Sequence, residues 1–87
     1  MHSNMPYFIY ILQSERDGSY YVGHTSNLDK RLKRHNEGRS TYTRTRIPWR
    51  VIYQEALPSR KAAMKREKKI KSMKSRGSIL ELVRASR

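Results

Sequence analysis

One carboxylate of this 87-residue chain lies where an apolar side chain is expected. In a helix, Glu67 shares with Ala63 and Ile70 the stripe that should face the core. A single inward carboxylate suits a Mg²⁺ site for phosphoryl transfer, because Mg²⁺ takes one or two carboxylates and keeps several of its waters. The alternative interpretation is structural, in which Glu67 pairs with a nearby arginine or with Lys71 one helical turn later.

A second pair of candidates lies on an earlier predicted helix. Leu28, Leu32 and His35 share one stripe of that helix, and Arg31 borders it. An arginine fork and an imidazole at the edge of a buried stripe can hold a phosphate. The alternative is that Arg31 is solvated and His35 is an ordinary boundary residue.

Tyrosine is the third candidate type. Two neighbouring predicted strands carry four tyrosines between them, namely Tyr7, Tyr10, Tyr20 and Tyr21. Such tyrosines usually pack against a sheet while their hydroxyls reach water. The sequence contains no serine triad and no glycine-rich phosphate loop that would compete with these features.

The charge of the chain indicates its partner. Lys and Arg number 20 against 7 Asp and Glu, a formal net charge of +13, and 19 of the 20 basic residues lie in 29–87. This excess favours nucleic acid as partner. An acidic membrane surface is the weaker alternative, because no segment combines bulky apolar residues with a basic face. The absence of cysteine excludes a disulfide scaffold, a thiol nucleophile and a cysteine-ligated metal.

The length of the chain predicts one domain, residues 1–87, with its core in about 6–83. No apolar run approaches the roughly 20 residues of a membrane span. The first six residues lack the basic and apolar regions of a signal peptide. We therefore expect a cytoplasmic protein that does not contact a membrane and is a monomer.

The first half of the chain predicts a hairpin and a helix. Residues 7–13 and 19–23 are rich in β-branched and aromatic residues, and Asp17-Gly18 between them tolerates positive φ. A helix over 27–37 follows, with Ser26 as its N-cap and Gly38 as its terminator.

The second half predicts a loop, a strand and two helices. Residues 38–48 are polar and basic, and the strand 49–55 alternates so that Trp49, Val51 and Tyr53 share a face. A long helix over 60–74 opens after Pro58-Ser59, and Ser78 to Glu81 forms a capping box for a short last helix. The expected fold class is α+β, a small three-stranded antiparallel β-sheet flanked by helices in the order β-β-α-β-α-α.

Three segments together resemble the GIY-YIG nuclease superfamily. They are Phe8-Ile9-Tyr10, Tyr21-Val22-Gly23, and the run 27–35. The length and the segment 62–71 resemble the small single-domain UPF0213 or YhbQ-like group, related to the N-terminal nuclease domain of the UvrC excinuclease subunit. The resemblance covers residues 6–83, and Phe8 stands where the first triplet has its glycine.

The resemblance implies a metal-dependent phosphodiesterase with five catalytic positions. Tyr10 and Tyr21 match the tyrosines of the two triplets, and Arg31 matches an arginine that stabilises the phosphate transition state. His35 falls where relatives carry His or Tyr. Glu67 falls at the metal-binding glutamate and would hold one Mg²⁺ or Mn²⁺ ion.

Further basic residues are candidates for nucleic-acid binding, and His24 among them matches a lysine of the UvrC-like domain. They are His24, Lys30, Lys33, Arg34, Arg39, Arg44, Arg46, Lys68 and Lys69. We expect the side chains of the catalytic tyrosines, arginine and glutamate to converge on one positive surface.

The leading hypothesis is a Mg²⁺-dependent endonuclease that acts on DNA, with repair or recombination as its setting. A planar arginine fork suits the non-bridging phosphate oxygens, and one metal ion supplies Lewis acidity. A tyrosine with a pKa near 10 is a poor base unless a nearby cation lowers that pKa, and the residues do not decide between Tyr10 and Tyr21. The alternatives are a non-catalytic basic nucleic-acid-binding module on the same scaffold and a protein that assembles on structured RNA.

Overall fold

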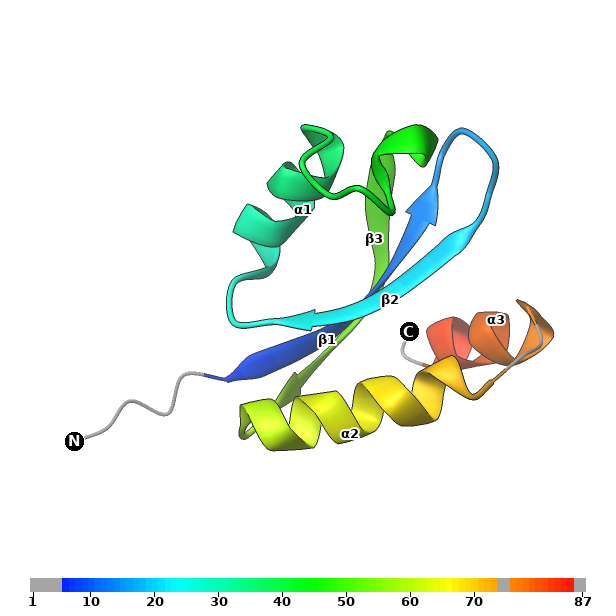
Figure 1. Ribbon diagram of the computed structural model, residues 1–87. Coiled ribbons are helices and arrows are strands. Elements are labelled where there is room, and N and C mark those ends of the chain that lie inside the picture. Colours follow the sequence, from blue (N-terminus) through cyan, green and yellow to red (C-terminus); the bar gives the residue numbers. More distant parts are fainter. Residues whose placement is uncertain (1–5, 74–75, 86–87) are drawn as a thin grey trace.

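A three-stranded antiparallel sheet lies between helices in this computed structural model, which describes residues 6–73 and 76–85 (Figure 1). The elements are β1 (Tyr7–Ser14), β2 (Tyr20–Thr25), α1 (Leu28–Asn36), the short 3₁₀ helix η1 (Arg44–Arg46), β3 (Trp49–Leu57), α2 (Arg60–Lys71) and α3 (Arg76–Ala85). The expected fold class and element order are confirmed. Within the described ranges no helix is both long and apolar enough to cross a membrane.

The central strand of the sheet is β1, because the strand order is β2-β1-β3. Its apolar run is buried on both faces of the sheet. Ile9 and Ile11 point to one face, while Tyr10 and Leu12 point to the other. All four side chains are fully buried. The continuous apolar run that the sequence shows is therefore the signature of a two-sided strand.

One face of the sheet holds an aliphatic core under α2 and α3. Ile9 and Ile11 pack there with Ala63 and Ile70 of α2 and with Ile79 of α3. Burying each large aliphatic side chain contributes about 1.5–3 kcal/mol to stability. Figure 1 shows α2 and α3 together on this side of the sheet.

The opposite face is covered by α1 and by the segment that contains η1 (Figure 1). Tyr10, Leu12 and Trp49 form its buried cluster. Buried polar side chains also lie in this half of the molecule, among them His35 and Thr43. The α2 face is mainly aliphatic, whereas the α1 face combines aliphatic and aromatic packing with the buried polar side chains of His35 and Thr43.

The prediction that Trp49, Val51 and Tyr53 share one face is wrong. Tyr53 pairs with Ile11 and Val51 pairs with Leu12, so Ile52 has no partner of its own and forms a β-bulge. The extra residue reverses the alternation. Trp49 and Val51 therefore pack on the α1 face, whereas Ile52 and Tyr53 pack on the α2 face.

Three helix boundaries also differ from the predicted ones. Helix α1 begins at Leu28 and is capped by Asn27, whose side chain accepts the Lys30 N–H, and not by Ser26. Helix α2 ends at Lys71 instead of 74, with Ser72 as its C-cap. Helix α3 begins at Arg76, so Ser78 lies inside its first turn and is not its N-cap.

The predicted hairpin and the predicted end of α1 are confirmed. Gly18 in the β1–β2 turn has φ of 78°, and Gly38 after α1 has φ of 76°. The Gly38 N–H donates to the carbonyl of His35, as expected for a glycine that terminates a helix.

Candidate active site

The Tyr10 side chain crosses the neighbouring strand at Gly23. The two residues are register partners, and a Cβ at Gly23 would lie 2.6 Å from the Tyr10 hydroxyl oxygen and 2.7 Å from Cζ. Only a glycine leaves room for the ring here. The glycine of the second triplet thus lets a fully buried tyrosine carry its hydroxyl across β2.

A chain of hydrogen bonds fixes His35 beneath this hydroxyl. Tyr10 Oη lies 3.2 Å from His35 Nε2, and His35 Nδ1 lies 2.8 Å from Thr43 Oγ1. Burial, followed by the positive charges of Arg31 and Arg34, lowers the pKa of His35. The imidazole is therefore neutral at neutral pH, and this arrangement suits Nε2 as acceptor from the tyrosine and Nδ1–H as donor to the threonine.

The Tyr10 hydroxyl keeps its proton. Burial raises the pKa of Tyr10 to about 12, and the neighbouring Tyr21 adds to the increase. Arg31 opposes it through its charge and a hydrogen bond, whereas the Glu67 carboxylate raises the pKa further. Tyr10 is consequently a hydrogen-bond donor at neutral pH.

Tyr21 and Arg31 lie at an opening in front of this buried pair. They line a pocket of about 190 Å³ together with Arg34, His35 and Ser40. The Tyr21 ring packs edge-on against His35 at 5.0 Å between centroids, and it lies 6.4 Å from the Tyr10 ring. The pocket therefore offers a phenol and two guanidinium groups to a ligand, with the imidazole behind them.

Glu67 lies at the β2 edge of the sheet, in a neighbouring pocket of about 290 Å³ that His24 and Lys68 also line. Its Oε1 contacts His24 Nδ1, and its Oε2 lies 2.6 Å from Lys71 Nζ. Burial raises the pKa of Glu67, but hydrogen bonds from Lys71 and His24 outweigh it and hold the pKa below its usual value. The carboxylate is therefore ionised at neutral pH.

The catalytic candidates line two pockets, and Arg31 from one and Glu67 from the other both act on the Tyr10 hydroxyl. Tyr21, Arg31 and His35 line one pocket, with Tyr10 buried behind them. Glu67 lines the adjacent pocket, yet its charge acts on Tyr10. Glu67 is therefore within electrostatic range of the group around Tyr21 and Arg31.

Glu67 suits a divalent metal ion that needs only one carboxylate ligand from the protein. The residues described in 6–73 and 76–85 contain no group of three or more Asp, Glu or His side chains that could enclose a metal. Mg²⁺ needs no such group, since it binds one or two carboxylates and retains water. Glu67 supplies one ionised carboxylate, and its present partners His24 and Lys71 would have to yield to the ion.

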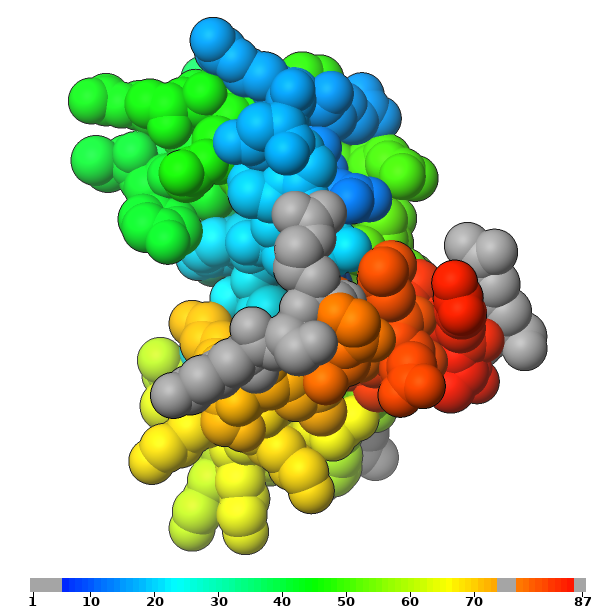
Figure 2. Space-filling model, turned by 90° about the vertical axis from the view of Figure 1, so that its right-hand side faces the viewer, coloured from blue at the N-terminus to red at the C-terminus, as the bar shows by residue number. Residues whose placement is uncertain are grey.

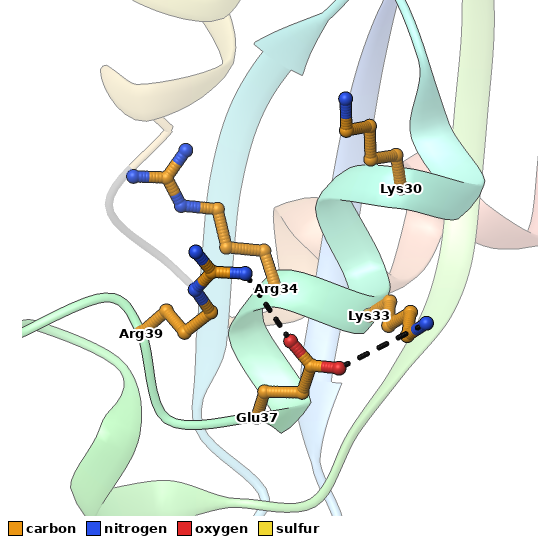
Figure 3. A pocket seen from close by; sticks show the side chains of 5 residues that line it. All are labelled: Lys30, Lys33, Arg34, Glu37 and Arg39. Carbon is orange, nitrogen blue, oxygen red and sulfur yellow. Dashed lines mark ion pairs between the residues drawn. The ribbon is translucent and has the colours of Figure 1, made fainter.

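The basic candidates of α1 and of the turn that follows it gather beside the Tyr21 pocket. Lys30, Lys33, Arg34 and Arg39 line a surface pocket of about 420 Å³, which also contains Glu37 (Figure 3). Figure 3 shows Glu37 between Lys33 and Arg39, to which dashed lines join it, while Lys30 and Arg34 extend away from it.

The remaining basic candidates that follow α1 lie on other elements of the fold. Lys68 lines the Glu67 pocket, and Lys69 is exposed on the same helix. Arg46 pairs with Asp17 of the hairpin turn at 3.1 Å, and Arg44 begins η1.

Besides Ser40, which lines the Tyr21 pocket, three further residues around the site were not among the sequence candidates. Thr43 holds His35, Trp49 donates its Nε1–H to the Thr43 carbonyl at 2.9 Å, and Tyr42 contacts Tyr21 at 5.9 Å between ring centroids. Thr43 and Tyr42 belong to the polar segment between α1 and β3, which shows no periodicity. No signal in the sequence marked them.

This arrangement of tyrosines, arginine and histidine around a basic pocket belongs to a known class. The family model of the GIY-YIG catalytic domain matches residues 6–78. The chain therefore belongs to the GIY-YIG family, a nuclease superfamily, and nucleic acid is the substrate that this family implies.

Within the family, the relatives of this chain are UPF0213 proteins, as the sequence predicted. It is 47% identical over 68 residues to a UPF0213 protein of Bacillus licheniformis, covering 77% of this chain and 68% of the relative. It is 40% identical over 73 residues to one of Halalkalibacterium halodurans, covering 83% and 77%. A solution NMR structure of a UPF0213 protein from Bacillus halodurans has a TM-score of 0.59 at 39% identity, covering 93% of this chain and 85% of that one.

Proposed function

We propose that this domain is a Mg²⁺-dependent endonuclease that hydrolyses phosphodiester bonds in nucleic acid, with DNA as its substrate. The observation that carries the proposal is the pocket in which Tyr21 and Arg31 meet in front of the neutral His35. Repair or recombination as its setting, the cytoplasm as its location and a monomeric state stay predictions.

Arg31 and Arg34 provide the phosphate site in this proposal. Both guanidinium groups line the Tyr21 pocket. A planar fork of N–H donors matches the non-bridging oxygens of a phosphodiester and stabilises the extra charge of the pentavalent transition state. Since arginine stays protonated throughout the accessible pH range, the site is positive whenever the protein is folded.

Tyr21, rather than Tyr10, is the tyrosine that we assign to the attacking water. Tyr10 is fully buried, and with a pKa of about 12 it keeps its proton. Tyr10 acts instead as a positioning residue, because its hydroxyl orients His35 against the Tyr21 ring. Tyr21 lines the pocket, where its hydroxyl can accept a hydrogen bond from water beside Arg31.

Glu67 is the residue that we expect to hold the metal. When bound, Mg²⁺ supplies Lewis acidity and lowers the pKa of its water. His24 and Lys71 hold the carboxylate ionised and oriented until then. The contacts of Glu67 with His24 and Lys71 also support the second candidate function, a non-catalytic binding module, because both carboxylate oxygens already have partners.

The test is a cleavage assay on supercoiled, branched and single-stranded DNA with Mg²⁺ or Mn²⁺, beside the Arg31→Ala variant. Arg31→Ala should lose at least about a hundredfold in cleavage rate, as removal of one transition-state donor does elsewhere. The matched control is Arg84→Ala, which removes the same side chain from the exposed side of α3 and should cleave normally. Binding without cleavage by the wild-type protein under every condition would favour the module instead.

A further inference from the structure

Tyr42 is the most exposed of the large hydrophobic side chains described, at 70%. It lies in the turn that follows α1, and its ring contacts Tyr21 at 5.9 Å between centroids. Leu80 of α3 is also exposed, at 43%, but it is aliphatic and lies on another part of the fold. Single exposed apolar residues are ordinary, so the location of Tyr42 is what gives it meaning.

The Tyr42 ring is the outer end of a continuous series of rings. Tyr10 is fully buried, His35 is 2% exposed, and both contact Tyr21. Tyr21 contacts Tyr42, whose ring faces solvent over most of its surface. The series thus leads from the centre of the candidate active site to an open aromatic surface beside it.

Basic side chains surround this series on the α1 side. Arg34 lines the Tyr21 pocket, the Lys33 pocket of Figure 3 and a third pocket with Lys30 and Thr25. Positive charge therefore continues along α1 from the proposed phosphate site. Figure 2 shows that the segment after α1 (green) projects from the surface beside the hairpin (blue to cyan).

An aromatic ring next to a phosphate site suits one kind of ligand. Bases of an unpaired strand present flat faces that stack on tyrosine, while their phosphates bind nearby arginine and lysine. Bases inside a duplex already stack on one another and are not available to a side chain beside the backbone. A phosphate site alone would accept both forms, whereas a stacking surface distinguishes them.

We propose that Tyr42 is a stacking platform for an unpaired base, and that the preferred substrate is a single-stranded or locally opened nucleic acid. This inference rests on the proposed function, because it assigns the substrate form of the same pocket. The base stacks on the outer face of Tyr42, and the adjoining phosphates bind Arg34 and the neighbouring basic side chains of α1.

The test is equilibrium binding in EDTA, which keeps cleavage out of the measurement. The probes are fluorescent oligothymidine, oligouridine and a DNA duplex of equal length. Tyr42→Ala should lose about tenfold in affinity for both single strands, corresponding to about 1.4 kcal/mol, and less than twofold for the duplex. Tyr42→Phe should bind as the wild type does, because the phenyl face also stacks. Leu80→Ala is the control for loss of an exposed hydrophobic side chain and should change nothing.

A second readout reports stacking directly. In Tyr42→Trp, the new indole should be quenched by oligothymidine, over the constant background of the buried Trp49. Equal losses for single strand and duplex in Tyr42→Ala, or no loss at all, would overturn the inference while leaving the nuclease proposal intact. A wild-type protein that binds none of the three probes would contradict both.

Discussion

Two consecutive residues of α2 form ion pairs with opposite edges of the sheet, and the pairs differ in kind. Arg66 binds Glu55 of β3 through Nε at 3.0 and 3.2 Å and through Nη2 at 2.8 Å. Glu67 binds His24 of β2 and, within its own helix, Lys71. Since β2 and β3 are the two edge strands, α2 is anchored across the whole width of the sheet.

The ion pair between Glu55 and Arg66 is bidentate. Both carboxylate oxygens accept from one rigid guanidinium, and the Tyr53 hydroxyl donates to Oε2 as well. The hydrogen bonds from Arg66 are the main reason why the pKa of Glu55 is lowered. A planar bidentate pair with a permanently charged partner has little reason to open.

The Glu67 pair can exchange its partners. Within residues 6–73 and 76–85, each oxygen has a single partner, one of them an imidazole and the other a lysine that is 52% exposed. Monodentate contacts to a titratable ring and to a flexible ammonium are easily replaced by a cation. The comparison places a structural carboxylate, Glu55 of β3, beside the proposed ligand carboxylate, Glu67 of α2, and it makes each a control for the other.

The largest expected effect is on cleavage in Glu67→Ala. Loss of the metal ligand should lower the cleavage rate by about a thousandfold or more, because a bound metal supplies several kcal/mol of transition-state stabilisation. The free energy of unfolding should change by no more than about 1 kcal/mol, since neither His24 nor Lys71 is left deeply buried. Thermal melts and cleavage rates on one preparation measure both. Normal cleavage by a folded Glu67→Ala protein would remove the metal assignment.

The reverse outcome is expected for Glu55→Ala. Arg66 and Tyr53 lose their common partner; Tyr53 is buried, and the side chains of Arg66 and Glu55 are only about a quarter exposed. We expect the free energy of unfolding to fall by about 1–3 kcal/mol, with cleavage retained at temperatures where the variant is folded. Chemical denaturation gives the stability. A Glu55→Ala protein that is as stable as the wild type would show that the Glu55–Arg66 pair does not hold α2 to the sheet.

The pH dependence of stability separates the same two carboxylates. Both have lowered pKa values, so each contributes stability that is present above about pH 4.5 and is lost as the pH falls through its folded pKa. At Glu55 the largest influence is the favourable hydrogen bond from Arg66, whereas at Glu67 it is burial, which opposes ionisation. Glu55→Gln should therefore reduce the loss of unfolding free energy between pH 5 and 3 more than Glu67→Gln does. Denaturation at several pH values in this range measures the loss.

The buried imidazole of His35 also contributes to the loss of stability in acid, but equally in the two Gln variants, so it cancels from their comparison. The pKa of His35 is lowered in the folded protein, so the unfolded chain takes up a proton first as the pH falls below about 6.5. Stability contributed by neutral His35 is therefore lost as the pH falls from about 6.5 to its folded pKa, and this loss is common to both Gln variants because His35 is unchanged in each. An equal loss of unfolding free energy on acidification in the two Gln variants would contradict the distinction between the two ion pairs.

The sequence predicted the elements of the sheet better than the faces of its last strand. The continuous apolar run of β1 and the turn around Gly18 are local signals, and the structure has the expected hairpin. The bulge at Ile52 depends on how β3 pairs with β1, so strict alternation assigned Tyr53 to the wrong face. Asn27 and Ser26 are both good caps, and the choice between them depends on a one-residue boundary.

The contacts of the candidate site were also predicted only where they are local in the sequence. Helical periodicity put Glu67 on the inward stripe, and the i,i+4 contact with Lys71 was foreseen as the structural alternative. Its other partner was not, because His24 is 43 residues away and meets it only through the fold. Thr43 and Tyr42 were missed for the same reason, since a polar loop without periodicity does not reveal which side chains it brings to a helix.

The smallest expected effect is on the Mg²⁺ requirement of the Lys71→Gln variant. Lys71→Gln removes the ammonium that competes with a metal ion for Glu67 Oε2. Helical and exposed ion pairs contribute about 0.3–1 kcal/mol, so the Mg²⁺ concentration for half-maximal cleavage should fall by about two- to fivefold.

Lys68→Gln is the matched control for this change, because it removes the same charge from the same helix and the same pocket. If Lys71 acts by occupying Glu67, only Lys71→Gln should alter the Mg²⁺ requirement, whereas both variants should weaken DNA binding slightly through the lost charge. Titrations of cleavage rate against Mg²⁺ at saturating DNA separate the two effects. Equal shifts in both variants would mean that the metal responds to the general positive field of α2, and a higher Mg²⁺ requirement in Lys71→Gln would mean that Lys71 orients the carboxylate for the ion instead of competing with it.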